Sequence, residues 1–117
     1  MLHHVSLENR EDEVERTVGF WALLGFERTE PPEAIAPYGT WLEREGTHIH
    51  LIHTQSPNVP VLGHAAVVAA DFERAASDLR EAGFEVTDAR ELWGESRAFA
   101  IAPGGHRVEL MAAPPAG

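Results

Sequence analysis

Apolar and polar residues follow a pattern of strand, helix and further strands, and the chain runs through it twice. Residues 72–82 place apolar side chains at helical spacing, with Asp71 positioned as a cap and Gly83 where a helix ends. Residues 14–24 repeat this arrangement and end at Gly25. Shorter alternating segments separated by turns follow each helix, so about three strands are expected after each. The two stripes comprise Val14, Thr17, Val18, Trp21 and Leu24, and Phe72, Ala75, Ala76, Leu79 and Ala82.

Short phrases of the sequence also recur in the same order. "GFERT" at 25–29 returns as "GFEVT" at 83–87, "HHVSL" at 3–7 as "GHAAVV" at 63–68, and "HIHLI" at 48–52 as "HRVEL" at 106–110. The offsets lie between 58 and 60 residues. An internal repeat of this length indicates two similar modules, about 1–56 and about 61–117, joined by the proline-bearing segment "QSPNVPVLG".

Strand alternation separates polar from apolar side chains in these repeated phrases. Apolar residues such as Ile49 and Leu51, or Val108 and Leu110, share one face of their strands. If those faces pack on the two helices, the inner face of the sheet carries His4, His50, His64 and Glu109.

Imidazoles together with a carboxylate suit a divalent ion such as Zn, Ni, Fe, Co or Mn. Taken one at a time, each histidine is more often a surface or hydrogen-bonded residue, but the agreement of repeat and alternation favours a metal site. The remaining histidines are expected to be structural or solvent-facing, because of strand parity or proximity to a turn: His3, His48, His53 and His106.

Composition narrows the class of protein further. With 117 residues and 44% apolar side chains, one compact domain is expected. The longest apolar run, "AAVVAA", is far below the roughly 20 residues of a membrane span, so a soluble, cytoplasmic protein without membrane contact is expected. There is no cysteine and no lysine, which excludes thiolate and Schiff-base chemistry, and the net charge of −10 argues against nucleic-acid binding.

Four segments carry a resemblance to a known family: "LHHVSL", "GFWALLGFE", "GHAAVVAADFERAASDLREAGFEV" and "RAFAIAPGGHRVELMAAP". The chain resembles the glyoxalase, bleomycin-resistance and extradiol-dioxygenase superfamily, the vicinal oxygen chelate proteins, over essentially its whole length. The resemblance implies an α+β fold of two βαβββ modules forming a curved, incompletely closed eight-stranded mixed sheet, with helices on the outer face. It also implies one divalent metal per site, held by His4, His50, His64 and Glu109, and a homodimer. Whether the site lies within one chain or is shared across the dimer stays open.

The resemblance implies a glyoxalase-like, metal-dependent enzyme of lyase, isomerase or dioxygenase type, acting on a small oxygen-bearing molecule. The alternatives are a bleomycin-resistance-like protein that sequesters a toxic ligand without turnover, and a degenerate structural or regulatory member. His50 stands where glyoxalase I-like members commonly carry a carboxylate, which weakens a direct glyoxalase I assignment. No subfamily pattern names the substrate.

Candidate substrate contacts are less sharply defined. Arg107 shares the strand parity of Glu109 and is placed to bind a substrate carboxylate or phosphate, although a surface ion pair is an equal alternative. Three aromatic residues are candidates for the pocket or for the core: Tyr38, Trp41 and Trp93. No catalytic base is identified from the sequence, and Glu43 and Glu91 remain open candidates.

Overall fold

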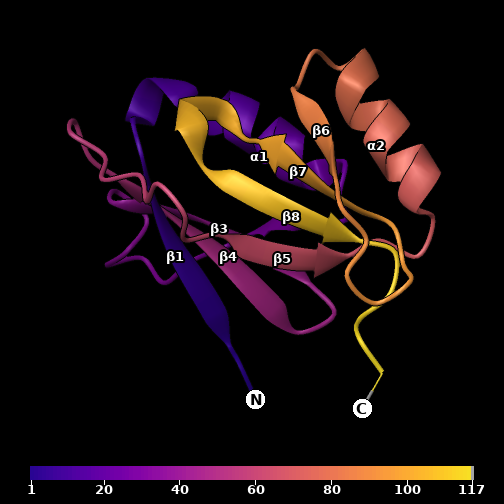
Figure 1. Cartoon of the computed structure of the whole chain (residues 1–117). Helices are drawn as coiled ribbons and strands as arrows, with labels where there is room; N and C mark the ends of the chain where they lie inside the picture. Colours follow the sequence, from indigo (N-terminus) through magenta and orange to yellow (C-terminus); the bar gives the residue numbers. More distant parts are fainter. Residues whose placement is uncertain (117) are drawn as a thin grey trace. The chain divides into compact units, whose positions relative to one another are not determined.

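The two halves of the sequence fold with the same order of elements (Figure 1). The computed structural model describes residues 1–116 and divides into two units, Met1–Val59 (unit one) and Pro60–Gly117 (unit two). Unit one contains β1 His4–Asn9, the 3-10 turn η1 Glu11–Glu13, α1 Val14–Ala22, β2 Glu27–Thr29, β3 Gly39–Arg44 and β4 Thr47–His53. Unit two contains β5 Ala65–Val68, α2 Phe72–Glu81, β6 Val86–Ala89, β7 Arg97–Ile101, η2 Pro103–Gly105 and β8 Arg107–Met111.

Each unit builds a four-stranded mixed sheet, in the order β1-β4-β3-β2 in unit one and β5-β8-β7-β6 in unit two. The first and last strands of a unit pair in parallel, because a helix and two further strands separate them in the chain. The remaining pairs are antiparallel. The expected α+β fold of two βαβββ modules is therefore confirmed. Its eight strands form two hydrogen-bonded sheets of four strands, one in each unit.

The helices bury most of the apolar stripes that the sequence pattern predicts. Val14, Thr17 and Trp21 of α1 are buried as expected, but Phe20 rather than Val18 completes the buried face. Phe72, Ala76 and Leu79 of α2 are buried as expected, but Ala75 is half-buried and Ala82, just after the helix, is exposed. In α2, the Asp71 side chain accepts a hydrogen bond from the Arg74 amide at 3.4 Å, which is the predicted N-cap.

The repeated Gly-Phe dipeptide ends both helices in the same way. Gly25 has φ +88° and Gly83 has φ +92°, a backbone conformation that glycine adopts at little cost. The amide of the next residue, Phe26 or Phe84, then donates to the carbonyl oxygen five residues earlier, at 3.0 Å in both cases. The recurrence of the phrase thus reflects two copies of one helix-ending motif.

Strand register confirms the predicted division between two sheet faces. In β4, Ile49 and Leu51 are buried and pair with Val5 and Leu7 of β1. In β8, Val108 and Leu110 are fully buried on the corresponding face. The intervening residues of β4 and β8, which include the candidate ligands, therefore lie on the opposite face of each sheet.

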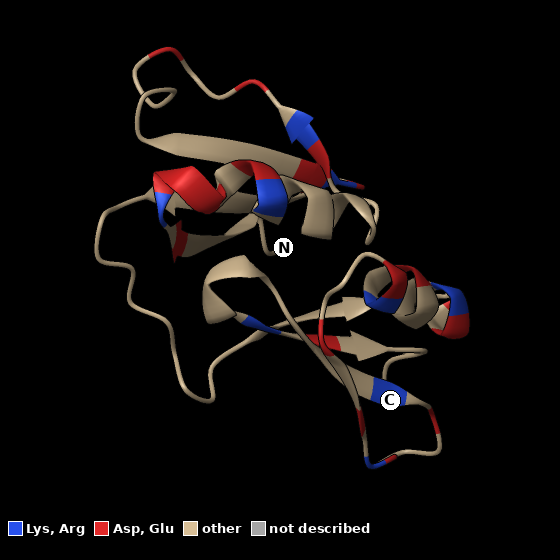
Figure 2. Ribbon diagram, turned by 90° about the horizontal axis from the view of Figure 1, so that it is seen from above, with Lys and Arg blue, Asp and Glu red and all other residues tan. Residues whose placement is uncertain are grey.

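Charged side chains are frequent on the helices of both units, as Figure 2 shows. Such positions are typical of solvated helix faces. Within residues 1–116, neither helix has the length and apolar character needed to cross a membrane.

Candidate metal-binding site

In unit one, the ring of His50 lies between two other aromatic rings. His4 stacks on it with ring centroids 4.0 Å apart, and Trp41 stacks on it at 4.0 Å with an interplanar angle of 3°. This follows from the register, because β4 lies between β1 and β3 and Trp41 pairs directly with His50. The packing leaves His50 only 7% exposed.

His3 and His48 also contact this group, which differs from the expectation that they lie apart from it. His3 Nδ1 is 2.9 Å from His4 Nδ1, its ring stacks on that of His48 at 4.7 Å, and His48 Nδ1 is 3.3 Å from His50 Nε2. Strand alternation fails for His3 because β1 begins only at His4. We refer to His3, His4, His48 and His50 as the histidine cluster.

The histidine cluster offers nitrogen donors at close range. One ring nitrogen from each of His3, His4 and His50 lies within 4.8 Å of the others. Burial, followed by the nearby charges of His4, His48 and His3, lowers the pKa of His50 from 6.5 to about 4. His50 is therefore a neutral imidazole at pH 7, the form that binds a metal.

In unit two, His64 and Glu109 form the second contact between candidate ligands. His64 Nε2 is 3.1 Å from Glu109 Oε1, and His64 Nδ1 is 2.9 Å from the carbonyl oxygen of Leu62. A carbonyl only accepts hydrogen bonds, so Nδ1 carries a proton and donates it. Nε2 therefore faces the carboxylate oxygen at hydrogen-bonding distance, and the same two atoms offer one nitrogen and one oxygen ligand to an ion.

Arg97 contacts the candidate ligand Glu109 and was not singled out from the sequence. Its Nε donates to Glu109 Oε2 at 2.8 Å, and its Nη1 donates to the Arg90 carbonyl at 2.7 Å. Burial alone raises the pKa of Glu109, but hydrogen bonds from Arg97 and His64, together with their charges, outweigh burial and lower it. Glu109 is thus held as a carboxylate. Strand alternation could have indicated its face, because Ala98 and Ala100 of the same strand are buried and Arg97 therefore points to the opposite side.

The predicted substrate-contact residues have different surroundings. Arg107 lies with its guanidinium 4.2 Å from the centroid of Phe99, which pairs with Glu109 across the sheet. Trp93 donates from Nε1 to the Ala113 carbonyl at 2.9 Å and contacts Arg97, so it supports the Arg97–Glu109 pair.

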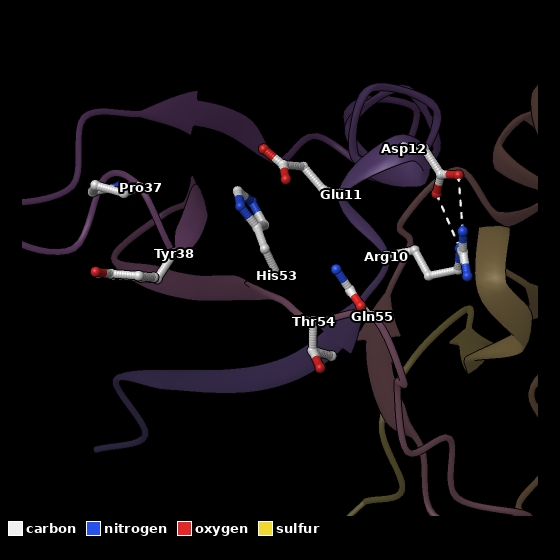
Figure 3. A pocket seen from close by; sticks show the side chains of 8 residues that line it. All are labelled: Arg10, Glu11, Asp12, Pro37, Tyr38, His53, Thr54 and Gln55. Carbon is white, nitrogen blue, oxygen red and sulfur yellow. Dashed lines mark hydrogen bonds and ion pairs between the residues drawn. The ribbon is translucent and has the colours of Figure 1, made fainter.

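Tyr38 lines a cavity of unit one and does not belong to the core. It is 68% exposed and lines a cavity of about 410 Å³ in unit one, together with Arg10 and His53 (Figure 3). An ion pair joins Arg10 and Asp12 at the edge of this cavity. His4 and His50 are not among its lining residues.

The other open candidates have local structural contacts. His53 Nε2 lies 2.9 Å from Thr40 Oγ1, and His106 is 5% exposed after the glycine turn, so both have the structural surroundings expected of them. Glu43 accepts the Gly46 amide at 3.1 Å within the β3–β4 hairpin. Glu91 lines a cavity of about 260 Å³ that Arg97 also lines.

Two βαβββ units, each with imidazole or carboxylate side chains on one sheet face, are the features to compare with known folds. The family model described as Glyoxalase/Bleomycin resistance protein/Dioxygenase superfamily matches residues 2–110. The chain therefore belongs to this superfamily. A comparison of the sequence with curated proteins finds no significant match.

Solved structures share the fold at low sequence identity. A protein from Bacillus anthracis assigned to the glyoxalase family has 24% identity and a TM-score of 0.85, over 95% of this chain and 93% of that one. The fosfomycin resistance protein FosX from Listeria monocytogenes has 16% identity and a TM-score of 0.78, over 97% and 91%. The oxidase ChaP-H2 has 17% identity and a TM-score of 0.77, over 100% and 96%.

Proposed function

We propose that this protein is a divalent-metal-dependent enzyme of lyase, isomerase or dioxygenase type, acting on a small oxygen-bearing molecule. The observation that carries the proposal is the His64–Glu109 pair. His64 Nδ1 donates to the Leu62 carbonyl, which directs Nε2 toward the Glu109 carboxylate at 3.1 Å, so one nitrogen and one oxygen ligand lie side by side. A backbone carbonyl that fixes the tautomer of a histidine is the usual arrangement around a metal-binding imidazole.

The remaining ligands in this proposal are His4 and His50. His50 is neutral at pH 7 because its pKa is about 4, so no proton competes with an ion for it under those conditions. Imidazoles with one carboxylate fit Zn, Ni, Fe, Mn or Co. The donor types, together with a neutral His50 and an ionised Glu109, therefore suit such an ion.

A bound ion would act as a Lewis acid on the oxygen atoms of the substrate. The protein's own residues supply orientation. Arg97 holds Glu109 ionised and fixes its Oε2, which leaves Oε1 directed toward His64. Arg107, on the same sheet face as Glu109, provides a cation for a substrate carboxylate or phosphate, and Trp41 provides a flat apolar surface beside His50.

A substrate panel with controlled metal content tests the proposal. Protein stripped with a chelator and reloaded with one metal at a time is assayed for turnover of small hydroxy, keto, epoxide and catechol compounds. Glu109→Gln keeps the shape of the side chain but removes its charge, and should abolish metal-dependent turnover. Glu81→Gln, at the exposed end of α2, is the matched control and should leave turnover unchanged. Turnover that persists at full rate in Glu109→Gln would contradict the assignment.

We also propose a homodimer, with the four ligands drawn either from one chain or from two. Mixing His4→Ala with Glu109→Ala protein under subunit exchange separates these arrangements. If ligands are shared between chains, a heterodimer has one site with all four ligands, and metal binding partly returns. If light scattering shows only a 12.8 kDa monomer, the dimer is wrong.

The second candidate function is sequestration of a small aromatic ligand without turnover. The stacking of Trp41 on His50 favours it, because an aromatic face of this kind also binds flat ligands. Tight binding of an aromatic compound by metal-free protein, with Trp41→Ala weakening it and no product formed, would favour this candidate over an enzyme.

A further inference from the structure

We propose that unit one is a metal site in its own right, in which His3 joins His4 and His50 as a third imidazole ligand. This inference rests on the proposed metal-dependent function and extends it.

The geometry of the cluster supports His3 as a ligand. Two nitrogens bound to one tetrahedral zinc ion lie about 3.3 Å apart, given Zn–N bonds of about 2.0–2.1 Å. His3 Nδ1 and His4 Nδ1 are 2.9 Å apart, and a nitrogen of His50 completes a set within 4.8 Å. His4 stacks on His50 at 4.0 Å, so the His4 ring has to turn out of this stack to bring three donors around one ion.

The surroundings of each ring allow this adjustment. His3 and His4 are exposed, so their side chains reorient at little cost in packing. His50 is instead fixed, because Trp41 stacks on it and His48 contacts its Nε2 at 3.3 Å. One rigid and two adjustable imidazoles form a site that orders when the ion binds.

The donor set also selects the class of ion. Three imidazoles without a carboxylate favour Cu²⁺, Ni²⁺ and Zn²⁺ over Mn²⁺ and Mg²⁺, which prefer oxygen ligands. We therefore expect unit one to retain the first group of ions, and to lose Mn²⁺, when the ligands of unit two are removed.

The test uses the full chain carrying His64→Ala and Glu109→Gln, so that only the histidine cluster remains. Chelator-stripped protein is titrated with Ni²⁺ and with Mn²⁺ by calorimetry. We expect about one equivalent of Ni²⁺ to bind, and His3→Ala in this background to lower the affinity at least about tenfold, which is the smallest loss typical of perturbing a metal site. His3→Gln, which keeps a polar side chain, should behave as His3→Ala does.

His53→Gln in the same background is the matched control, because His53 contacts Thr40 and not the cluster. Circular dichroism verifies that each variant is folded. Less than about a tenth of an equivalent of Ni²⁺, or unchanged affinity in both His3 variants, overturns the inference while leaving the four-ligand proposal intact. If the His64→Ala, Glu109→Gln protein instead binds Ni²⁺ as tightly as the unmodified chain, the four-ligand proposal fails and the unit-one site stands.

Discussion

Replacing Arg97 with methionine should destabilise the protein substantially. The change removes the 2.8 Å bond to Glu109 Oε2 and leaves a carboxylate that is only 6% exposed. Removing one partner of a buried ion pair costs about 3–5 kcal/mol, because an uncompensated charge remains. His64 still contacts Oε1, so we expect the lower end, about 3 kcal/mol at pH 7.

This free energy corresponds to a clear shift in melting temperature. An unfolding entropy of about 2.1 cal/mol/K per residue gives about 0.25 kcal/mol/K for a chain of this length, so about 3 kcal/mol lowers the melting temperature by about 12 °C. The folded state lowers the pKa of Glu109 below its ordinary 4.5. The stabilisation is therefore present above pH 4.5 and is lost as pH falls through the lower folded value.

Thermal melts of chelator-treated protein, followed by circular dichroism, provide the assay. Arg97→Met combined with Glu109→Gln should be more stable than Arg97→Met alone, because no buried charge is left unpaired. Arg107→Met is the matched control, since its guanidinium packs on Phe99, and it should cost no more than about 1 kcal/mol. A shift of less than about 3 °C for Arg97→Met at pH 7 would refute the reasoning.

Three further predictions concern other parts of the fold. His50 has a folded pKa of about 4 against an ordinary 6.5, so the unmodified protein loses stability as pH falls from 6.5 toward 4. In denaturant melts over this range, His50→Gln should lose up to about 3 kcal/mol less than the unmodified protein. An equal pH slope in both proteins would contradict this. Gly83→Ala places a side chain at φ +92° and should cost about 1–2 kcal/mol in a thermal melt, whereas Gly19→Ala within α1 should be neutral or stabilising. His4→Ala should weaken Zn²⁺ or Ni²⁺ binding at least about tenfold in competition with a chromophoric chelator, and unchanged affinity would remove His4 from the ligand set.

Much of the fold was predictable because it depends on local patterns that recur. Gly25 and Gly83 mark helix ends through their backbone requirement, and the alternation around Ile49 and Leu51 assigns strand faces. These sequence patterns depend only on neighbouring residues. Each pattern also occurs in both halves of the chain, so one copy supports the interpretation of the other.

The site was less predictable, because its contacts depend on strand register and on residues outside the strands. Arg97 reaches Glu109 only because β7 pairs with β8 so that Phe99 faces Glu109. Alternation assigns Arg97 and Arg107 to the same face, so it does not tell which of the two reaches Glu109. His3 precedes β1, so alternation gave no guide to its direction.

The central claim is that this chain binds one divalent first-row metal ion per site. The most direct measurement is elemental analysis of chelator-stripped protein after incubation with Zn²⁺, Ni²⁺, Mn²⁺ and Fe²⁺ and removal of unbound metal. The His50 imidazole is neutral and the Glu109 carboxylate ionised at pH 7, so neither has to lose a proton, and we predict about one equivalent of at least one of these ions. Less than about a tenth of an equivalent of every ion would contradict the account.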